Sequence, residues 1–210
     1  MCDEFYTVAN ASESLYIVKK SKFISNVVPV TSSAEAEDYI EKFRKKYWDA
    51  THNVYAYSVG LKSEIQRCSD DGEPSGTAGK PVLEVIKSRD VKNVLIVVTR
   101  YFGGILLGAS GLIRAYSESA SRGLENSKIV KNIKCNVYQI STDYTMLGKL
   151  QWELNQKNIL IKDINYAEDV KMKIYVPTSY TIDIMKHILD LTSGTADVKF
   201  MGNEFIVQDN

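Results

Sequence analysis

The sequence predicts an α+β protein of two domains, and three observations support this class. Strand-like and helix-like apolar patterns follow one another along all 210 residues, a length sufficient for two small domains. The pattern of the first part ends at Lys128–Lys134, where we expect the boundary. The last part shows the element order βαββαβ, which is the ferredoxin-like split βαβ pattern. We therefore expect domains at residues 1–130 and 131–210.

The first part opens with two strand-like runs, Tyr16–Val18 and Phe23–Val30. Ser32 followed by Glu35 is a capping-box signature, so a helix is expected to begin there. Apolar residues then recur at helical spacing as far as Tyr47. This spacing predicts one amphipathic helix of about three turns.

Five more elements complete the first part, and the most buried of them is expected at Val94–Val98. That run is apolar without alternation, which is typical of a strand covered on both faces. The predicted elements are strands at His52–Val59, Ile65–Cys68 and Val94–Val98 and helices at Gly79–Lys87 and Gly108–Asn126.

The second part has shorter elements and is expected to close with a hairpin. Ala167–Asp169 reads as a hairpin turn, and Gly194 is a natural residue just beyond a helix end. The predicted elements are strands at Val137–Ser141, Ile159–Tyr166 and Val170–Val176, helices containing Met146–Leu154 and Ile184–Leu189, and a final hairpin of Asp197–Met201 and Glu204–Val207.

Composition is that of an ordinary soluble protein. Lysine and arginine number 26 and are balanced by 26 acidic residues, so nucleic acid would have to be bound through a local patch. All six arginines precede residue 123, which places any anion site in the first part. Three scattered cysteines favour neither a disulfide framework nor a zinc site, and no apolar run approaches the ~20 residues of a membrane span. We expect reduced thiols, no cofactor, no metal and no membrane partner.

An acidic turn contains Asp70, Asp71 and Glu73 within four residues. Carboxylates this close can hold a hard cation such as Mg²⁺, or one can act as a general base. The alternative is a structural turn in which aspartate side chains bond their own backbone. His52, at the head of a predicted strand, joins this group either as an acid–base residue or as a hydrogen-bonded structural residue.

A glycine-rich loop follows the acidic turn and leads into a predicted helix. Ser75, Thr77, Gly79 and Lys80 can present donors to an anion, as in a phosphate cradle. The glycine spacing and Pro81 after the lysine do not match the P-loop, so nucleotide hydrolysis of that kind is not expected. Anion binding and a purely structural turn both remain open.

A basic and aromatic turn, Thr99–Gly104, follows the predicted buried strand. Arg100 and Tyr101 together offer an anion fork and a stacking face, a pair that single-stranded nucleic acid uses. The alternative is that Arg100 pairs with Asp70 or Asp71 while Tyr101 packs. The predicted anion- and nucleic-acid-binding residues are Arg67, Ser75, Thr77, Gly79, Lys80, Arg100, Tyr101, Gly103, Gly104 and Arg114.

Four stretches of the sequence resemble the YigZ/IMPACT family. They are His52–Asn53 with Ala56–Tyr57, Arg67–Pro81, Val98–Gly104 and Gly111–Tyr116, and the SDDGEPSGTAG string within the second is long and unusual. The resemblance covers essentially the whole chain, in the bacterial two-domain form. One departure is Ser110, where the family usually has a further glycine.

The resemblance implies an N-terminal domain like domain 2 of ribosomal protein S5 and a ferredoxin-like C-terminal domain. The pair is similar to two adjacent domains of elongation factor G. Eukaryotic members of the family regulate translation during amino-acid starvation by binding a partner protein.

We therefore expect a non-enzymatic, cytoplasmic binding protein linked to translation, which recognises RNA or a ribosomal surface through the glycine-rich turns. One alternative is an enzyme or small-ligand site for a phosphorylated substrate, with the acidic turn as metal holder or base. Another is a protein–protein regulator.

Overall fold

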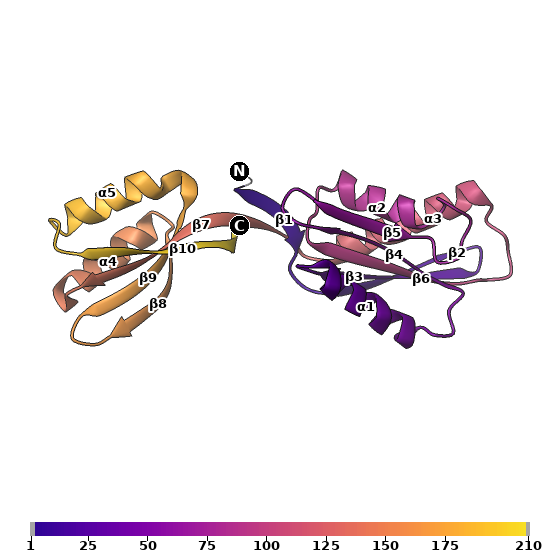
Figure 1. Cartoon of the computed structure of the whole chain (residues 1–210), viewed down its shortest axis with the longest axis horizontal. Coiled ribbons are helices and arrows are strands. Elements are labelled where there is room, and N and C mark those ends of the chain that lie inside the picture. Colours follow the sequence, from indigo (N-terminus) through magenta and orange to yellow (C-terminus); the bar gives the residue numbers. More distant parts are fainter. Residues whose placement is uncertain (1–2, 209–210) are drawn as a thin grey trace. The chain divides into compact units, whose positions relative to one another are not determined.

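The computed structural model describes residues 3–208. The chain divides into an N-terminal unit, Glu4–Lys131, and a C-terminal unit that starts at Asn132. Each unit combines helices with a β-sheet, so the predicted α+β class is confirmed (Figure 1). Within the described residues, no helix is both long and apolar enough to cross a membrane.

The sheet of the N-terminal unit has five strands, and all neighbours in it run antiparallel. β6 is the central strand and pairs with β3 on one side and β4 on the other. The order across the sheet is β2 (Ser12–Val18), β3 (Ser21–Pro29), β6 (Val94–Tyr101), β4 (His52–Val59) and β5 (Ile65–Ser69).

Helices cover both faces of this sheet (Figure 1). The helix α1 (Ser33–Lys46) packs on one face, and α2 (Gly79–Ser88) and α3 (Ala109–Asn126) pack on the other. Because neighbouring side chains of a strand point to opposite faces, β6 contributes Ile96 and Val98 to the α2–α3 side and Leu95 and Val97 to the α1 side. The predicted burial of this strand on both faces is therefore confirmed.

Half of the capping box predicted before α1 is present. The backbone N–H of Glu35 donates to Ser32 Oγ at 3.2 Å, which satisfies one of the donors that a helix start leaves unpaired. The return bond reaches the residue before the N-cap, because Glu35 Oε2 accepts from the backbone N–H of Thr31 at 2.7 Å.

The C-terminal unit has the element order β7 (Ile129–Thr142), α4 (Tyr144–Gln156), β8 (Leu160–Tyr166), β9 (Val170–Pro177), α5 (Thr181–Leu191) and β10 (Asp197–Gln208), with a short 3₁₀ turn at Thr178–Tyr180. β10 pairs with β7, β7 with β9, and β9 with β8. The strand β1 (Glu4–Val8), in the N-terminal unit, was not among the predicted elements. Apolar residues of α4 and α5, including Leu150, Leu154 and Ile188, form the core against the sheet.

The predicted final hairpin is wrong, because β10 is a single strand. The sequence Gly202–Asn203 suggested a turn, and Gly202 does take a left-handed φ of +124°. The chain nevertheless continues along the sheet. The Glu204 carboxylate, beyond the glycine, accepts from Lys173 Nζ at 3.2 Å and Tyr175 OH at 2.8 Å, both on β9.

Candidate functional site

Asp70 is bound by the loop that follows it. Its Oδ1 accepts from the backbone N–H groups of Ala78 at 3.0 Å and Gly79 at 2.8 Å, and its Oδ2 accepts from that of Gly76 at 2.8 Å. Burial raises the pKa of this carboxyl, but the three backbone bonds together outweigh burial and hold the pKa below its usual value. The carboxylate thus satisfies donors at the start of α2, which matches the structural alternative for this turn.

Asp71 joins the acidic turn to β4 and α1. Its Oδ2 accepts from the backbone N–H of Asn53 at 2.6 Å, and its Oδ1 accepts from Arg44 Nη2 at 3.4 Å. The Asp71 carbonyl lies 2.7 Å from His52 Nδ1. Because a carbonyl can only accept, Nδ1 carries the proton, and His52 Nε2 lies 3.9 Å from Glu73 Oε1. His52 is therefore oriented by the backbone of the turn.

Glu73 is the centre of a buried polar cluster. Its side chain is only 3% exposed, and Oε1 accepts from Arg100 Nη1 at 2.6 Å and from Tyr116 OH at 2.7 Å. The Arg100 guanidinium also lies over the rings of Phe23 and Phe102, at 5.6 and 5.5 Å from their centroids. Burial is the main cause that raises the pKa of Tyr116, and the neighbouring Glu73 carboxylate raises this pKa further. The Tyr116 hydroxyl therefore stays protonated and donates.

The expected anion-binding role of Arg100 is not supported. Arg100 is 5% exposed, because it follows Val98 by two residues and shares its inward face. Its charge is paired with Glu73, and not with Asp70 or Asp71 as the alternative had it. An ion pair between the two turns does exist, and it holds them together from the inside.

The glycine-rich loop directs its donors inward. Gly79 packs so closely on β5 that an added Cβ would lie 2.7 Å from the carbonyl carbon of Ser69. Thr77 Oγ1 donates to the carbonyl of Pro74 at 2.6 Å. Together with the bonds to Asp70, these contacts occupy the Thr77 hydroxyl and the Gly79 N–H, two of the groups that were expected to cradle a phosphate.

Three of the predicted anion-binding residues lie on the surface near this loop. Ser75 and Lys80 are exposed. Arg67, on the edge strand β5, is exposed as well and its Nη1 donates to Glu37 Oε1 at 3.2 Å. None of the three lines either of the two cavities described below.

The basic and aromatic turn, Thr99–Gly104, is bonded both to the segment after α1 and to the β2–β3 hairpin. Tyr101 OH donates to Asp49 Oδ1 at 2.8 Å, and the backbone N–H of Gly103 donates to Ser21 Oγ at 3.1 Å. A Cβ on Gly103 would overlap the backbone of Lys20, and Gly104 takes a left-handed φ of +80°. The glycines therefore permit close approach of two loops and a reversal of the chain.

Lys19 and Lys20 form the two-residue turn of the β2–β3 hairpin. Both residues are left-handed, with φ of 45° and 64°, and the flanking pair is Val18 with Ser21. A turn of this geometry usually takes Asn or Gly. Two lysines at such positions carry a conformational cost, and such costs cluster at functional sites.

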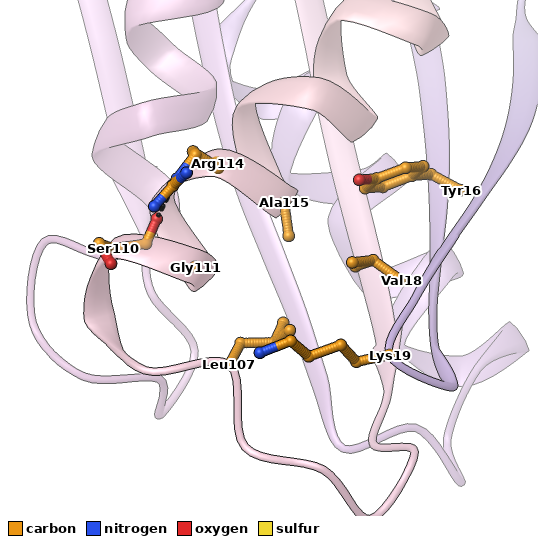
Figure 2. A pocket seen from close by; sticks show the side chains of 8 residues that line it. All are labelled: Tyr16, Val18, Lys19, Leu107, Ser110, Gly111, Arg114 and Ala115. Carbon is orange, nitrogen blue, oxygen red and sulfur yellow. Dashed lines mark hydrogen bonds between the residues drawn. The ribbon is translucent and has the colours of Figure 1, made fainter.

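A cavity of about 290 Å³ lies between this hairpin and the first turn of α3, and we call it the helix-start cavity (Figure 2). Tyr16 and Lys19 line it from the hairpin, and Ser110, Gly111 and Arg114 line it from α3. Lys19 extends along the cavity, whereas Arg114 turns back to donate to the Ser110 carbonyl at 3.3 Å (Figure 2). The expected residue Arg114 is thus part of a concave, positively charged surface.

A second cavity, of about 370 Å³, lies on the other side of the same turn, and we call it the Phe102 cavity. Its lining consists of Lys20, Lys22, Ile24, Tyr101 and Phe102. Phe102 is 46% exposed. The linings of the two cavities hold four cationic side chains and no carboxylate, which favours an anionic ligand.

Comparison with known proteins places the chain in a family. Residues 19–124 match the Impact N-terminal domain, and residues 140–195 match a domain of unknown function. The IMPACT family member YvyE of Bacillus subtilis (strain 168) is 44% identical over 199 residues, which span 95% of this chain and 92% of that protein. The chain belongs to the IMPACT family.

Other IMPACT-family proteins match over different lengths. IMPACT family member YigZ of Escherichia coli (strain K12) is 30% identical over 180 residues, 85% of this chain and 88% of that protein. Protein IMPACT of Xenopus laevis is 41% identical over 95 residues, 43% of this chain and 30% of that protein. A solved structure described as "Crystal structure of an hypothetical protein" has a TM-score of 0.62 and 27% identity, covering 95% of this chain and 98% of that chain.

The motifs of this IMPACT-family chain therefore divide into two groups. The long SDDGEPSGTAG string mainly builds the interior of the N-terminal unit, through Asp70 and Glu73. The open, positively charged surface lies beside it, at the hairpin turn and the start of α3. Sequence reasoning included Tyr101 and Arg114 but missed Lys19, Lys20, Lys22 and Phe102. The available signal was the run Lys19–Lys22 between two strand-like segments.

Proposed function

We propose that the N-terminal unit binds the phosphate backbone of nucleic acid, with RNA exposed on the ribosome as the candidate partner. The observation that carries this proposal is the helix-start cavity, in which Lys19 and Arg114 flank the first turn of α3. The site would be a binding surface and would need no catalytic group.

Three features of the helix-start cavity suit a phosphate. Lys19 supplies a mobile point charge, and Arg114 supplies a planar fork that matches phosphate oxygens. The backbone N–H groups of Ser110 and Gly111 belong to the first turn of α3, where a helix leaves donors without an intrahelical partner. The N-terminus of a helix also carries partial positive charge, which favours an anion.

The two cavities are positively charged, although the protein as a whole has no net charge. The whole protein has a formal net charge of zero, whereas the two cavities hold Lys19, Lys20, Lys22 and Arg114 without a carboxylate in either lining. A local cluster of this kind gives the salt-dependent attraction that phosphate backbones require. The left-handed φ of both lysines in the turn agrees with this proposal, since such backbone strain clusters at functional sites.

The enzyme alternative has less support from geometry. Asp70 already accepts three backbone donors, Asp71 accepts from Asn53 and Arg44, and Glu73 accepts from Arg100 and Tyr116. Carboxylates used in this way have fewer lone pairs available for a cation or for proton transfer.

We also propose the finer fold assignments and the cellular role that the family resemblance implies. The N-terminal unit would be a ribosomal protein S5 domain 2-like domain. The C-terminal unit would be ferredoxin-like, which its βαββαβ order and the strand sequence β10-β7-β9-β8 support. The role in translation and the cytoplasmic location are those that the family resemblance implies.

Binding of labelled RNA, measured by fluorescence anisotropy over a range of salt concentrations, tests the proposal. If Lys19 and Arg114 each neutralise one phosphate, the double variant Lys19→Ala/Arg114→Ala should lower the slope of log K against log[salt] by about 1.5. Affinity at low salt should fall as well.

The matched control removes the same charge elsewhere. Lys87 and Arg89 are exposed residues at the end of α2 and pair with Glu84 and Glu125. The variant Lys87→Ala/Arg89→Ala should keep the salt slope of the parent. Equal effects of the two double variants, or no RNA binding by the parent, would refute the proposed site.

A further inference from the structure

We propose that the Phe102 cavity receives an unstacked base, so that the nucleic acid bound at the hairpin is single-stranded. This inference rests on the proposed function and names its substrate class. It assigns Phe102 as a base-stacking residue and Lys20 and Lys22 as the charges that flank the base.

The Phe102 ring is held in place with much of its surface open. Its side chain is 46% exposed and lines the cavity of about 370 Å³, near the low end of the size range for small-ligand sites. The Arg100 guanidinium lies over the ring at 5.5 Å from the centroid. A base stacked on the ring would complete a layered arrangement of guanidinium, ring and base.

The backbone around Phe102 is fixed before any ligand arrives. The Phe102 N–H donates to Thr51 Oγ1 at 3.0 Å. The next residue, Gly103, donates to Ser21 Oγ at 3.1 Å and packs against the Lys20 backbone without room for a Cβ. A stacking ring that is already positioned loses little conformational freedom on binding, which favours affinity.

The chemistry of the lining points to a base more than to a purely apolar group. Two lysines, Lys20 and Lys22, accompany the aromatic rings of Tyr101 and Phe102, and the lining contains no carboxylate. Aromatic faces next to cations are the combination that proteins use for single strands, because each base offers a π-face and each nucleotide a phosphate. In a duplex these faces are covered by neighbouring bases.

The hairpin turn brings the two cavities together. Lys19 lines the helix-start cavity and the following residue, Lys20, lines the Phe102 cavity. Consecutive Cα atoms are about 3.8 Å apart, so a strand that crosses the turn can place a phosphate on one side and a base on the other. A rigid duplex cannot bend over a two-residue turn in this way, because its persistence length is about 150 base pairs.

The test compares a single-stranded oligonucleotide with the duplex of the same sequence, each as RNA and as DNA. An adenine analogue whose fluorescence is quenched by stacking reports on the base directly. The parent should bind the single strand more tightly than the duplex and should quench the analogue at one position. Phe102→Leu should remove the quenching and weaken single-strand binding about tenfold, with little effect on the duplex.

Leu106 provides the matched control, because it is 82% exposed in the same loop and lines neither cavity. Leu106→Ser should bind and quench like the parent. Loss of binding in Leu106→Ser, or binding of the parent to anionic vesicles that this variant abolishes, would show that the loop inserts into an apolar partner and would overturn the inference.

The failure of this inference can be told apart from failure of the proposed function. If Lys19→Ala/Arg114→Ala lowers the salt slope but the parent prefers duplex and never quenches the analogue, only the base site is wrong. If the parent binds no nucleic acid, both are wrong. Should Phe102→Leu not fold, the parent's quenching and its single-strand preference decide the question.

Discussion

Arg100 and Glu73 form a 2.6 Å ion pair in the interior of the N-terminal unit, with side chains 7% and 3% exposed. The pair connects the end of β6 to the acidic turn before α2. Removal of one partner would leave a buried charge without its counter-ion. We therefore expect Glu73→Gln to lower the free energy of unfolding by about 3–5 kcal/mol, measured by urea denaturation.

Two controls accompany this prediction. Glu37→Gln breaks an exposed pair with Arg67 and should cost at most about 1 kcal/mol. The double variant Glu73→Leu/Arg100→Met should recover much of the loss, because it leaves no buried charge behind. A mild effect of Glu73→Gln alone would show that the pair is not a stabilising link between the turns.

Asp70 should make stability depend on pH in the acidic range. Its folded-state pKa lies below the ordinary value of 3.8 despite burial, because three backbone N–H groups bind the carboxylate. A lowered pKa means that the stabilisation is present above pH 3.8 and is lost as the pH falls through the folded-state pKa. Asp70→Asn must also turn an NH₂ group toward a backbone donor, so we expect a loss of about 1.5–3 kcal/mol near neutral pH.

The measurement is the free energy of unfolding of the parent and of Asp70→Asn, at a series of pH values from neutral to below 3.8. The difference in free energy of unfolding between them should shrink at the acidic end. A difference that stays constant with pH would mean that the charge of Asp70 contributes nothing.

Two glycines should respond to alanine in opposite directions. Gly148 lies inside α4, and a Cβ there would meet no heavy atom within 4 Å. Gly148→Ala should raise stability by up to about 1 kcal/mol, because alanine loses less backbone entropy in a helix. Gly103→Ala should lower the thermal midpoint and weaken RNA binding, since its Cβ would displace the Lys20 turn. Thermal denaturation of both variants measures the contrast.

Divalent cations should have little effect on the acidic turn. Asp70, Asp71 and Glu73 are each bound to at least two donors, so a cation would have to displace existing bonds. We expect millimolar Mg²⁺ to leave the thermal midpoint unchanged in the parent and in Asp71→Asn. A Mg²⁺-dependent rise in the parent that Asp71→Asn abolishes would favour the enzyme alternative.

Local patterns predicted most of the elements well. The unbroken apolar run of β6 indicated burial on both faces, and Ser32 with Glu35 located the start of α1. Predictions failed where a local signal competed with sheet pairing. Gly202–Asn203 read as a turn, but the strand β10 continues through it, and the short β1 gave too weak a pattern to be recognised.

The candidate site was harder to predict, because it depends on which residues face inward. A sequence shows Arg100 beside a glycine turn but does not show that strand alternation directs it to Glu73. Within the most distinctive motif, Glu73 and Thr77 are buried, and the Asp70 carboxylate is bound by backbone donors of its own loop. Lys19 lies between two strand-like runs of the sequence, and its relation to Arg114 is visible only when β2 and α3 are packed together.

The position of β6 also determines when the N-terminal sheet can assemble. β2 with β3 and β4 with β5 are hairpins of neighbouring strands, whereas β6 is made after all four and inserts between β3 and β4. During synthesis the strands β3 and β4 therefore lack their partner β6 until Val94–Tyr101 has left the ribosome. Closing the sheet requires long-range pairings, which are slow to form. Until β6 is available, the edges of β3 and β4 that it covers in the folded sheet are open to other strands.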